Sequence, residues 1–329
     1  MTGCGNILYV STLAWHQGFI LSHCVPIQEV LGNTSRNAEE KEKIRFIQEV
    51  KRYGEERLGL KKTKSYTTFF DVEGPILNVV TASEKDRLQL RAWNFPVVGE
   101  VTYKGFFTRE DALKEQRLLE KEDLDTFLQQ AGAYSTLGYL RDPIFSSMLT
   151  WRHAMLANTV LHEMTHTTIY FKNETSLNEQ VATFIGNRGA IDFLSETYGS
   201  GSKEVLEALH LQEDDLLFSR WVDRACERLS SLYAREISRE EKLKEREEIF
   251  HSIRDGFKET KTQLKTEMYR GVEKVSLNNA VLLAYRRYIH HLEAMEALYE
   301  ERGRDLRRVV EYFKEMQASK EKLSSLSER

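Results

Sequence analysis

The chain has 329 residues and a mass of 38.4 kDa, which allows one large or two modest domains with a sizeable core. Hydrophobic residues make up 41% of it and charged residues 30%, and the formal net charge is −4. Because the chain is slightly acidic and has no basic block interleaved with aromatic residues, nucleic acid is not an expected partner. No apolar run reaches the roughly eighteen residues that a membrane-spanning helix needs.

The first residues leave the cellular location open. Thr2 and Gly3 stand immediately before Cys4, like the small residues at the end of a bacterial lipoprotein signal, but no charged and apolar stretch precedes them. One expectation is that translation starts at Met1 and the protein is cytoplasmic. The other is that the start lies upstream, so that Cys4 is the lipidated first residue of a periplasmic or membrane-anchored lipoprotein and associates with a membrane.

The N-terminal region is expected to be helical. Residues 7–31 are moderately apolar and predict an amphipathic or buried helix that leads to Pro26. Residues 35–58 predict a second, highly charged helix, because their apolar side chains recur at the spacing that places them on one face. The charges of this second helix are expected to face solvent.

A small sheet is expected to follow. Runs of β-branched and aromatic residues predict strands at 67–72, 76–81 and 97–107. Thr108 then begins a helix that ends near Asp123, and a short strand is expected at 126–129. Since this strand precedes the apolar helix described next, an edge of the sheet could lie beside that helix.

Residues 161–186, LHEMTHTTIYFKNETSLNEQVATFIG, contain the pattern on which the functional interpretation depends. His162 and His166 form an H-E-x-x-H run, and on a helix two histidines four residues apart share one face and can bind one metal ion. Glu163 lies beside the first histidine and could accept a proton from water at that ion. Glu179 is the candidate third ligand, and two histidines with a glutamate form a hydrolytic zinc set.

Simpler interpretations stay open at this point. An H-E-x-x-H run can occur by chance on a solvated helix. Ser176 and Glu179 also fit a capping box, in which the glutamate only accepts a hydrogen bond from the backbone at the start of a helix. Against chance, residues 155–161 are mostly apolar, which predicts that the histidines emerge from a buried helix. Ala182, Gly186 and Gly189 form a stripe of small residues that would let a second helix approach closely.

With these residues in view, the chain resembles a bacterial family of predicted aminopeptidases. In that family an H-E-x-x-H helix is followed at short range by an N-E-x-x-A-T-F-x-G segment, which here occupies residues 178–186. Other stretches that resemble the family are WNFP at 93–96, YKGFF at 103–107, AYSTLG at 133–138 and NNA at 278–280. The resemblance covers most of the chain and implies a zinc peptidase of the gluzincin type with ligands His162, His166 and Glu179 and catalytic base Glu163. Glu179 follows His166 sooner than the corresponding glutamate in thermolysin-like enzymes, so the connecting turn must be tight.

The sequence suggests three further site residues. Residues 132–138 could border the substrate cleft, with Tyr134 directed into it, beside an edge strand that holds an extended peptide. Residues 278–298 predict a helix, from which the hydroxyl of Tyr285 could act catalytically as the hydrogen-bond donor to an oxyanion. Asn278 is a candidate substrate-binding residue because it belongs to the NNA run. For each of the three, a purely structural role is the alternative.

The predicted fold class is α+β, predominantly helical, with a small sheet packed beside the H-E-x-x-H helix. Residues 1–64 form an N-terminal helical segment, 65–200 a zincin-like catalytic core, and 201–329 a C-terminal helical region. The predicted function is that of a zinc-dependent peptidase, a probable aminopeptidase, which binds one Zn²⁺ per chain and a peptide substrate. The alternatives are an endopeptidase of the same chemistry and a non-catalytic, envelope-associated helical protein that retains a structural metal. The sequence leaves the oligomeric state open.

Overall fold

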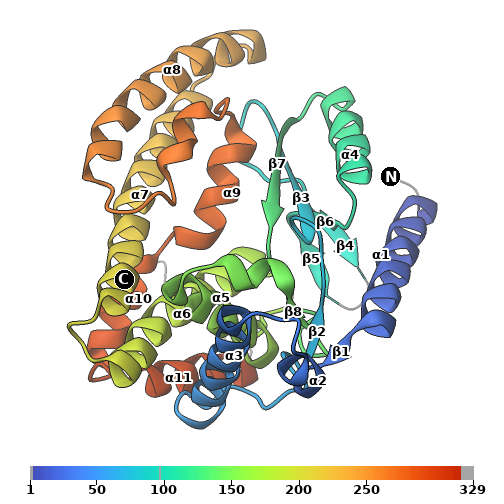
Figure 1. Cartoon of the computed structure of the whole chain (residues 1–329). Coiled ribbons are helices and arrows are strands. Elements are labelled where there is room, and N and C mark those ends of the chain that lie inside the picture. Colours follow the sequence, from blue (N-terminus) through green and yellow to red (C-terminus); the bar gives the residue numbers. More distant parts are fainter. Residues whose placement is uncertain (1–2, 96–97, 320–329) are drawn as a thin grey trace.

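The structure, a computed structural model, describes residues 3–95 and 98–319, and for residues 3–8 it describes the backbone alone. Helices dominate the fold and the strands form only small sheets, which confirms the predicted α+β class (Figure 1). The side chain of Cys4 lies outside the described residues. No helix in the described part of the chain is long and apolar enough to cross a membrane.

The expected first helix ends just before Pro26, as predicted. Helix α1 (Gly3–His23) ends before the short strand β1 (Val25–Pro26), and α2 (Ile27–Gly32) begins directly afterwards. Proline has a fixed φ and no backbone N–H, so it suits the residue before a new helix and not the interior of a long one. Helix α3 (Ala38–Glu56) lies where predicted: the Asn37 side chain caps it, and one face is buried. The expectation that its charges face solvent is wrong for Lys43 and Lys51, which are buried.

The strands are distributed over three small sheets in the described part of the chain, where the sequence had suggested one. Their orders are β1-β2-β8, β6-β3-β7 and β4-β5. In the second sheet β3 is central and antiparallel to both neighbours, and β7 pairs with it over its whole length. Bounds are β2 Thr68–Phe70, β3 Leu77–Ser83, β4 Trp93–Phe95, β5 Gly99–Val101, β6 Lys104–Phe106, β7 Asp125–Ala131 and β8 Ile144–Phe145.

Helix α4 (Arg109–Lys121) begins as predicted, because the Thr108 side chain accepts a hydrogen bond from the Asp111 backbone N–H. Leu119 of α4 is fully buried and packs with Val80 of β3 in a small core of its own. Helix α4 therefore covers one face of the β6-β3-β7 sheet and leaves the other face to α9 (Asn279–Ile289), beside which β7 runs (Figure 1).

The remaining helices surround this sheet and the central pair α5 and α6. Helices α7 and α8 form an antiparallel hairpin at the left of Figure 1, and Ser238 and Glu241 form a capping box at the start of α8. The helix expected at 278–298 is interrupted at His291, which has a left-handed φ of 62°. Bounds are α5 His153–Thr168, α6 Thr175–Tyr198, α7 Lys203–Tyr233, α8 Arg239–Gln263, α10 Leu292–Glu301 and α11 Leu306–Ser319, with 3₁₀ turns at Ser146–Thr150 and Arg270–Lys274.

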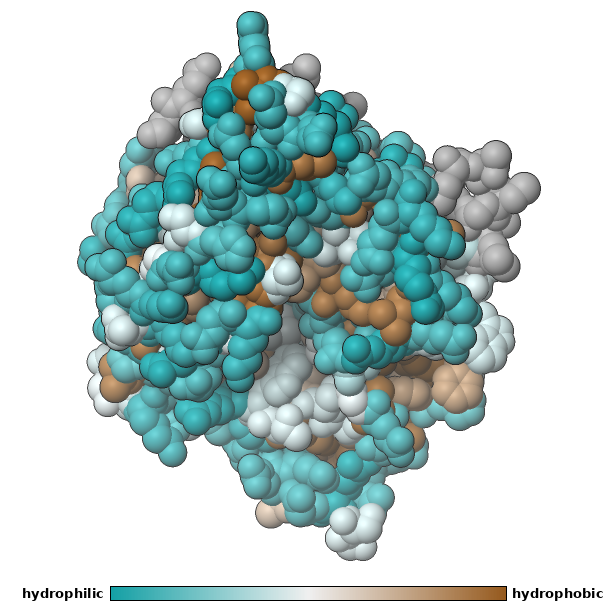
Figure 2. Space-filling model, turned by 90° about the horizontal axis from the view of Figure 1, so that it is seen from above, coloured by the Kyte–Doolittle hydropathy of each residue, from teal (hydrophilic) through white to brown (hydrophobic). Residues whose placement is uncertain are grey.

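One large hydrophobic core draws on all three predicted regions, from Ile20 of α1 to Met316 of α11. The division of the chain into three regions, with boundaries near residues 64 and 200, stays a prediction. The surface seen from above is mostly hydrophilic, and a hollow near its middle is bordered by hydrophobic and neutral residues (Figure 2).

Close packing of α5 against α6 depends on glycine. A Cβ atom added at Gly186 would lie 2.9 Å from the backbone oxygen of Asn158 and 3.3 Å from Cβ of His162. One added at Gly189 would lie 2.7 Å from Cδ1 of Leu161. The small-residue stripe therefore permits the close approach that the sequence suggested.

Gly186→Ala is expected to destabilise the chain by about 1 kcal/mol. Alanine adds about 1 kcal/mol of helix propensity, but overpacking against a backbone atom costs about 1–3 kcal/mol. Gly256→Ala in α8 is the matched control, because no atom lies within 4 Å of its added Cβ, and it should be stabilising. Urea unfolding of both variants measures the difference, and equal stabilisation by both would contradict the close packing.

Candidate metal centre

Helix α5 is a central helix of the core. Leu156, Val160 and Leu161 are fully buried, while His162 and Glu163 reach a partly exposed face. The two histidines follow four residues apart, so their side chains stand one turn apart on that face. The buried setting predicted from residues 155–161 is therefore confirmed.

The turn between α5 and α6 is short and firmly held. Helix α5 ends at Thr168 and α6 begins at Thr175. The side-chain amide of Asn178 donates to the backbone oxygen of Phe171 and accepts from its backbone N–H, at 2.8 and 2.7 Å. This pair of hydrogen bonds fixes the first turn of α6 against the end of α5, and it places the neighbouring Glu179 opposite the two histidines.

Three donor atoms converge at this point. Nε2 of His162 lies 3.1 Å from Nε2 of His166, and Oε2 of Glu179 lies 3.3 and 3.4 Å from these two nitrogens. Tetrahedral ligands bound to zinc at about 2.0–2.1 Å stand about 3.3 Å from one another. The spacing of the three donor atoms therefore fits a zinc ion. In the described part of the chain, these three residues are the group of His, Cys, Asp or Glu side chains that could hold a metal ion.

The capping-box interpretation of Glu179 is wrong. Helix α6 has Glu174 as its N-cap residue, without a side-chain cap, and Ser176 already lies inside the helix. The carboxylate of Glu179 is directed to His162, His166 and the hydroxyl of Tyr103. Glu179 is 95% buried, so its carboxylate contacts these groups and is shielded from bulk water.

The charges of the cluster suit a cation. Burial alone would raise the pKa of Glu179, but the adjacent His166 and His162 lower it below its ordinary value, so the group stays a carboxylate. Burial likewise opposes protonation of His166, and Glu179 nevertheless raises its pKa. The cluster therefore attracts positive charge between two imidazoles and a carboxylate, which is the position a divalent ion would occupy.

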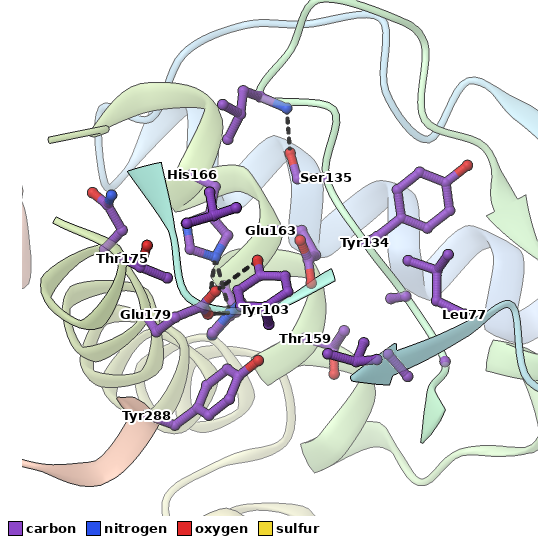
Figure 3. Close-up of a pocket in the computed structure, with 18 of the residues that line it drawn as sticks. Leu77, Tyr103, Tyr134, Ser135, Thr159, Glu163, His166, Thr175, Glu179 and Tyr288 are labelled. Atoms are coloured by element: carbon purple, nitrogen blue, oxygen red, sulfur yellow. Dashed lines mark hydrogen bonds and ion pairs between the residues drawn. The ribbon is translucent and has the colours of Figure 1, made fainter. Parts of the chain in front are cut away.

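Glu163 lies beside the cluster but is not part of it. It lines the same cleft as His162, His166 and Glu179 (Figure 3). Removal from water raises the pKa of its carboxyl, and the two histidines partly offset this effect. A carboxylate of raised basicity at the edge of a metal position is suited to accept a proton.

Comparison with known families agrees with these observations. The family described as "Putative aminopeptidase" matches residues 8–325, which is nearly the whole chain. The chain belongs to this aminopeptidase family. Searches of curated proteins and of solved structures found no significant match.

In this member of the aminopeptidase family, Tyr103 and Arg287 hold Glu179 in place. The hydroxyl of Tyr103 donates to Oε1 of Glu179 at 3.2 Å, which leaves Oε2 for the histidine side. The guanidinium of Arg287 stacks on the ring of Tyr103 at 4.8 Å and is 99% buried. Arg287 also donates to the hydroxyl of Thr81 and the backbone oxygen of Thr102. It thus holds Tyr103 between α9 and the strands.

A buried polar chain also holds α5 in place. The amide of Asn158 donates to Asn187 of α6, which donates to Asp215 of α7 at 2.7 Å. The hydroxyl of Tyr269 donates to the second oxygen of Asp215 at 2.5 Å. Burial raises the pKa of Asp215 to about 6. The rotation of α5, and with it the direction of the histidines, is therefore fixed by hydrogen bonds as well as by packing.

The cleft at the cluster has a volume of about 330 Å³. Strand β7 ends at it with Ala131, and the following residues 132–135 line it, as the sequence suggested for this segment. Tyr134 lines the cleft too, but its hydroxyl donates to Oε1 of Gln17 at 2.6 Å, and its ring lies away from His166 and Glu179 (Figure 3).

Two candidate residues lie elsewhere. The Tyr285 ring packs edge-on against Phe218 at 5.1 Å in an aromatic cluster, and Tyr285 is not among the described residues that line the cleft. Asn278 caps α9: its side chain accepts from the Val281 N–H and donates to the backbone oxygen of Thr126. Tyr285 thus packs in the core on the apolar face of α9, and Asn278 holds the start of that helix.

The sequence interpretation missed Tyr103 and Tyr288. Tyr288 lines the cleft, with its ring 6.3 Å from that of His162. Burial raises its pKa, so its hydroxyl keeps its proton at neutral pH. Helical spacing could not tell Tyr288 from Tyr285, because residues three apart are neighbours on a helix surface and both rings also pack against the core. Tyr103 belongs to the YKGFF stretch, which indicates the family but no role.

Proposed function

We propose that this chain is a zinc-dependent peptidase whose metal is held by His162, His166 and Glu179. The observation that carries the proposal is the convergence of these three donor atoms beside Glu163 in one cleft. A structural metal site does not need a base at its edge, so this arrangement argues for hydrolysis. The family description supports peptide substrates.

A zinc ion in this position would supply a Lewis acid that polarises the peptide carbonyl and acidifies a water molecule. Glu163 would accept the proton of the attacking water at a carboxylate oxygen and then deliver it to the nitrogen of the leaving amine. One residue can serve both steps because it regains its charge at the end of the reaction. Since Glu163 is partly buried, its carboxylate is more basic than one in water.

Tyr288 is our candidate for the group that donates a hydrogen bond to the developing oxyanion. It lines the cleft, it is protonated at neutral pH, and it belongs to a helix separate from the metal ligands. A donor of this kind stabilises negative charge where it appears in the transition state. It takes the role that the sequence had suggested for Tyr285.

The end of β7 is the proposed place for the substrate backbone. Among the described strands β7 is at the edge of its sheet, and its last residue, Ala131, lines the cleft together with Gly132. An extended peptide could pair with this edge by main-chain hydrogen bonds. Tyr134 would then border the peptide without touching the metal ligands.

Endopeptidase action is a second candidate, favoured by one observation. An aminopeptidase binds the free α-amine of its substrate, commonly through a carboxylate. Among the described residues that line the cleft, the carboxyl groups are those of Glu163 and Glu179, and both have other roles. No further acidic group there stands ready to bind an amine.

Hydrolysis of paired peptides tests both candidates. The zinc-loaded chain is incubated with a set of internally quenched peptides, each with a free or an acetylated N-terminus, before and after removal of zinc by a chelator. We expect hydrolysis that stops on chelation and returns with zinc. Cleavage of free peptides alone indicates an aminopeptidase, and cleavage of both indicates an endopeptidase. Hydrolysis that persists without metal would contradict the zinc mechanism.

Tyr103→Phe is expected to weaken zinc binding about 10–100-fold, because groups that orient a ligand have effects of this size. The change removes only the hydroxyl that donates to Glu179. Competition with a chromogenic chelator measures the affinity. Tyr134→Phe is the matched control, since it removes a hydroxyl from the same cleft that bonds to Gln17 and to no ligand. Equal zinc affinity in the two variants would show that Tyr103 does not support the site.

A further inference from the structure

Beside the cleft is a second cavity, the apolar chamber, which lies between α1 and the strands. Val10, Leu13 and Gln17 of α1 form one wall, and Leu77, Val101 and Phe107 belong to the other. The chamber has a volume of about 480 Å³, within the range of about 300–1,000 Å³ that is typical of ligand pockets.

The chamber and the cleft adjoin one another. Leu77, Val101 and Tyr134 line both of them. In Figure 3, Leu77 and Tyr134 lie together on the side of the cleft opposite His166 and Glu179. A molecule whose reacting bond lies at the metal cluster could therefore extend a side group past Leu77 and Tyr134 into the chamber.

The lining of the chamber limits what it can hold. None of the described residues that line it carries a charge, and most of them are aliphatic or aromatic. A charged side chain placed there would lose its hydration without gaining a partner, which is costly. An apolar side chain would instead be removed from water at a gain.

Gln17 provides an independent indication of a ligand. It is 92% buried and lines the chamber, and its Oε1 accepts from the hydroxyl of Tyr134. Its Nε2 has no hydrogen-bond partner among the described residues. Buried donors are normally satisfied, so an unpartnered donor on a residue of the chamber wall is a candidate to bind an acceptor of a ligand.

We propose that the apolar chamber is a substrate subsite for an uncharged, apolar side chain of a peptide, and that Gln17 donates to a carbonyl oxygen of the same peptide. This inference rests on the proposed peptidase function. It adds the class of substrate: peptides with a bulky apolar residue next to the cleaved bond.

The test uses two series of internally quenched peptides and the full-length, zinc-loaded chain. Each series varies the residue on one side of the cleaved bond among alanine, leucine, phenylalanine and aspartate. In one of the series we expect kcat/KM for leucine or phenylalanine to exceed that for alanine at least about tenfold, because single methylene groups are already discriminated by closed pockets. Aspartate should be the poorest. Equal kcat/KM for all residues in both series would overturn the proposal.

Substitutions in α1 test whether the chamber causes the preference for apolar residues. Leu13→Trp and Val10→Trp should fill it and bring the leucine-to-alanine ratio towards one. Val10 is 43% exposed, so its variant has room to fold even if the first does not. Trp15→Ala is the control on the same helix, because Trp15 is 66% exposed and does not line the chamber, and its ratio should stay as in the wild type. A ratio unchanged in a folded tryptophan variant would overturn the proposal.

Gln17→Glu tests the unpaired donor. The new carboxylate can still accept from Tyr134, but it presents an oxygen in place of Nε2. We expect KM to rise about tenfold across the preferred series with a smaller change in kcat. An unchanged KM would overturn the role of Gln17.

If no peptide is cleaved, the peptidase proposal fails, and direct binding then decides the chamber. N-acetyl-phenylalanine amide is the probe, because it has an apolar side chain, two carbonyl oxygens and no charge. Ligand-observed NMR should show that it binds the wild type and the Trp15→Ala variant and not the Val10→Trp variant. Binding that is absent from the wild type, or equal in all three, would overturn the subsite.

Discussion

Glu163→Gln is expected to lower kcat by about 10²–10⁴-fold, the usual contribution of a general base, while the protein keeps about one zinc ion per chain. Glutamine has nearly the same shape as glutamate but cannot accept the proton of the attacking water. Because Glu163 is not one of the three converging donors, its replacement should leave the ligand set intact. Turnover of a cleaved peptide and elemental analysis of the purified variant measure the two effects.

His162→Ala is the comparison for this variant, since it should lose both the metal and the activity. The pair separates the two roles that adjacent residues play on one helix. Full activity in Glu163→Gln would show that another group accepts the proton. Loss of zinc from Glu163→Gln would show instead that Glu163 is a ligand.

Glu179→Ala is expected to lower zinc affinity by more than about 100-fold, beyond the range of groups that only support a ligand. The change removes one of three donors and the only carboxylate among them, so the two imidazoles would have to hold the ion alone. Elemental analysis after removal of loosely bound ions measures the content, and chelator competition measures the affinity.

Glu174→Ala serves as the control for Glu179→Ala. Glu174 is an exposed carboxylate at the start of the same helix, and its side chain makes no capping hydrogen bond. Its replacement should leave zinc content unchanged. If Glu179→Ala also retains all its zinc, the third ligand is wrong and the two histidines must bind the ion with another partner.

The grouping of His162, His166 and Glu179 could be predicted because it is local in sequence. A helix places residues four apart on one face, so the two histidines follow from spacing, whereas Glu179 was the candidate third member beside a capping-box alternative. The same locality explains why Gly186 was recognisable as a packing position. Capping at Thr108 was also predicted from neighbouring residues.

The groups around the ligands could not be found in this way. Tyr103 reaches Glu179 from the strand region, 76 residues earlier in the chain, and Arg287 reaches Tyr103 from α9. Such contacts depend on how the sheet and the helices pack, and the spacing of residues in the sequence does not predict that packing. The division of the strands into three sheets has the same origin, since β2 pairs with the distant β8 and not with β3.

The proposed ligands and base occupy positions 162–179, on one pair of consecutive helices, whereas most of the other residues that line the cleft and the chamber come from α1, the strands, the segment 132–137 and α9. The proposed ligands and base are thus encoded apart from most of the residues that would select the substrate. Relatives could therefore differ in substrate preference while α5 and α6 stay the same. Within this family, variation that tracks substrate should gather around residues 10–17, 77, 101, 107 and 132–137.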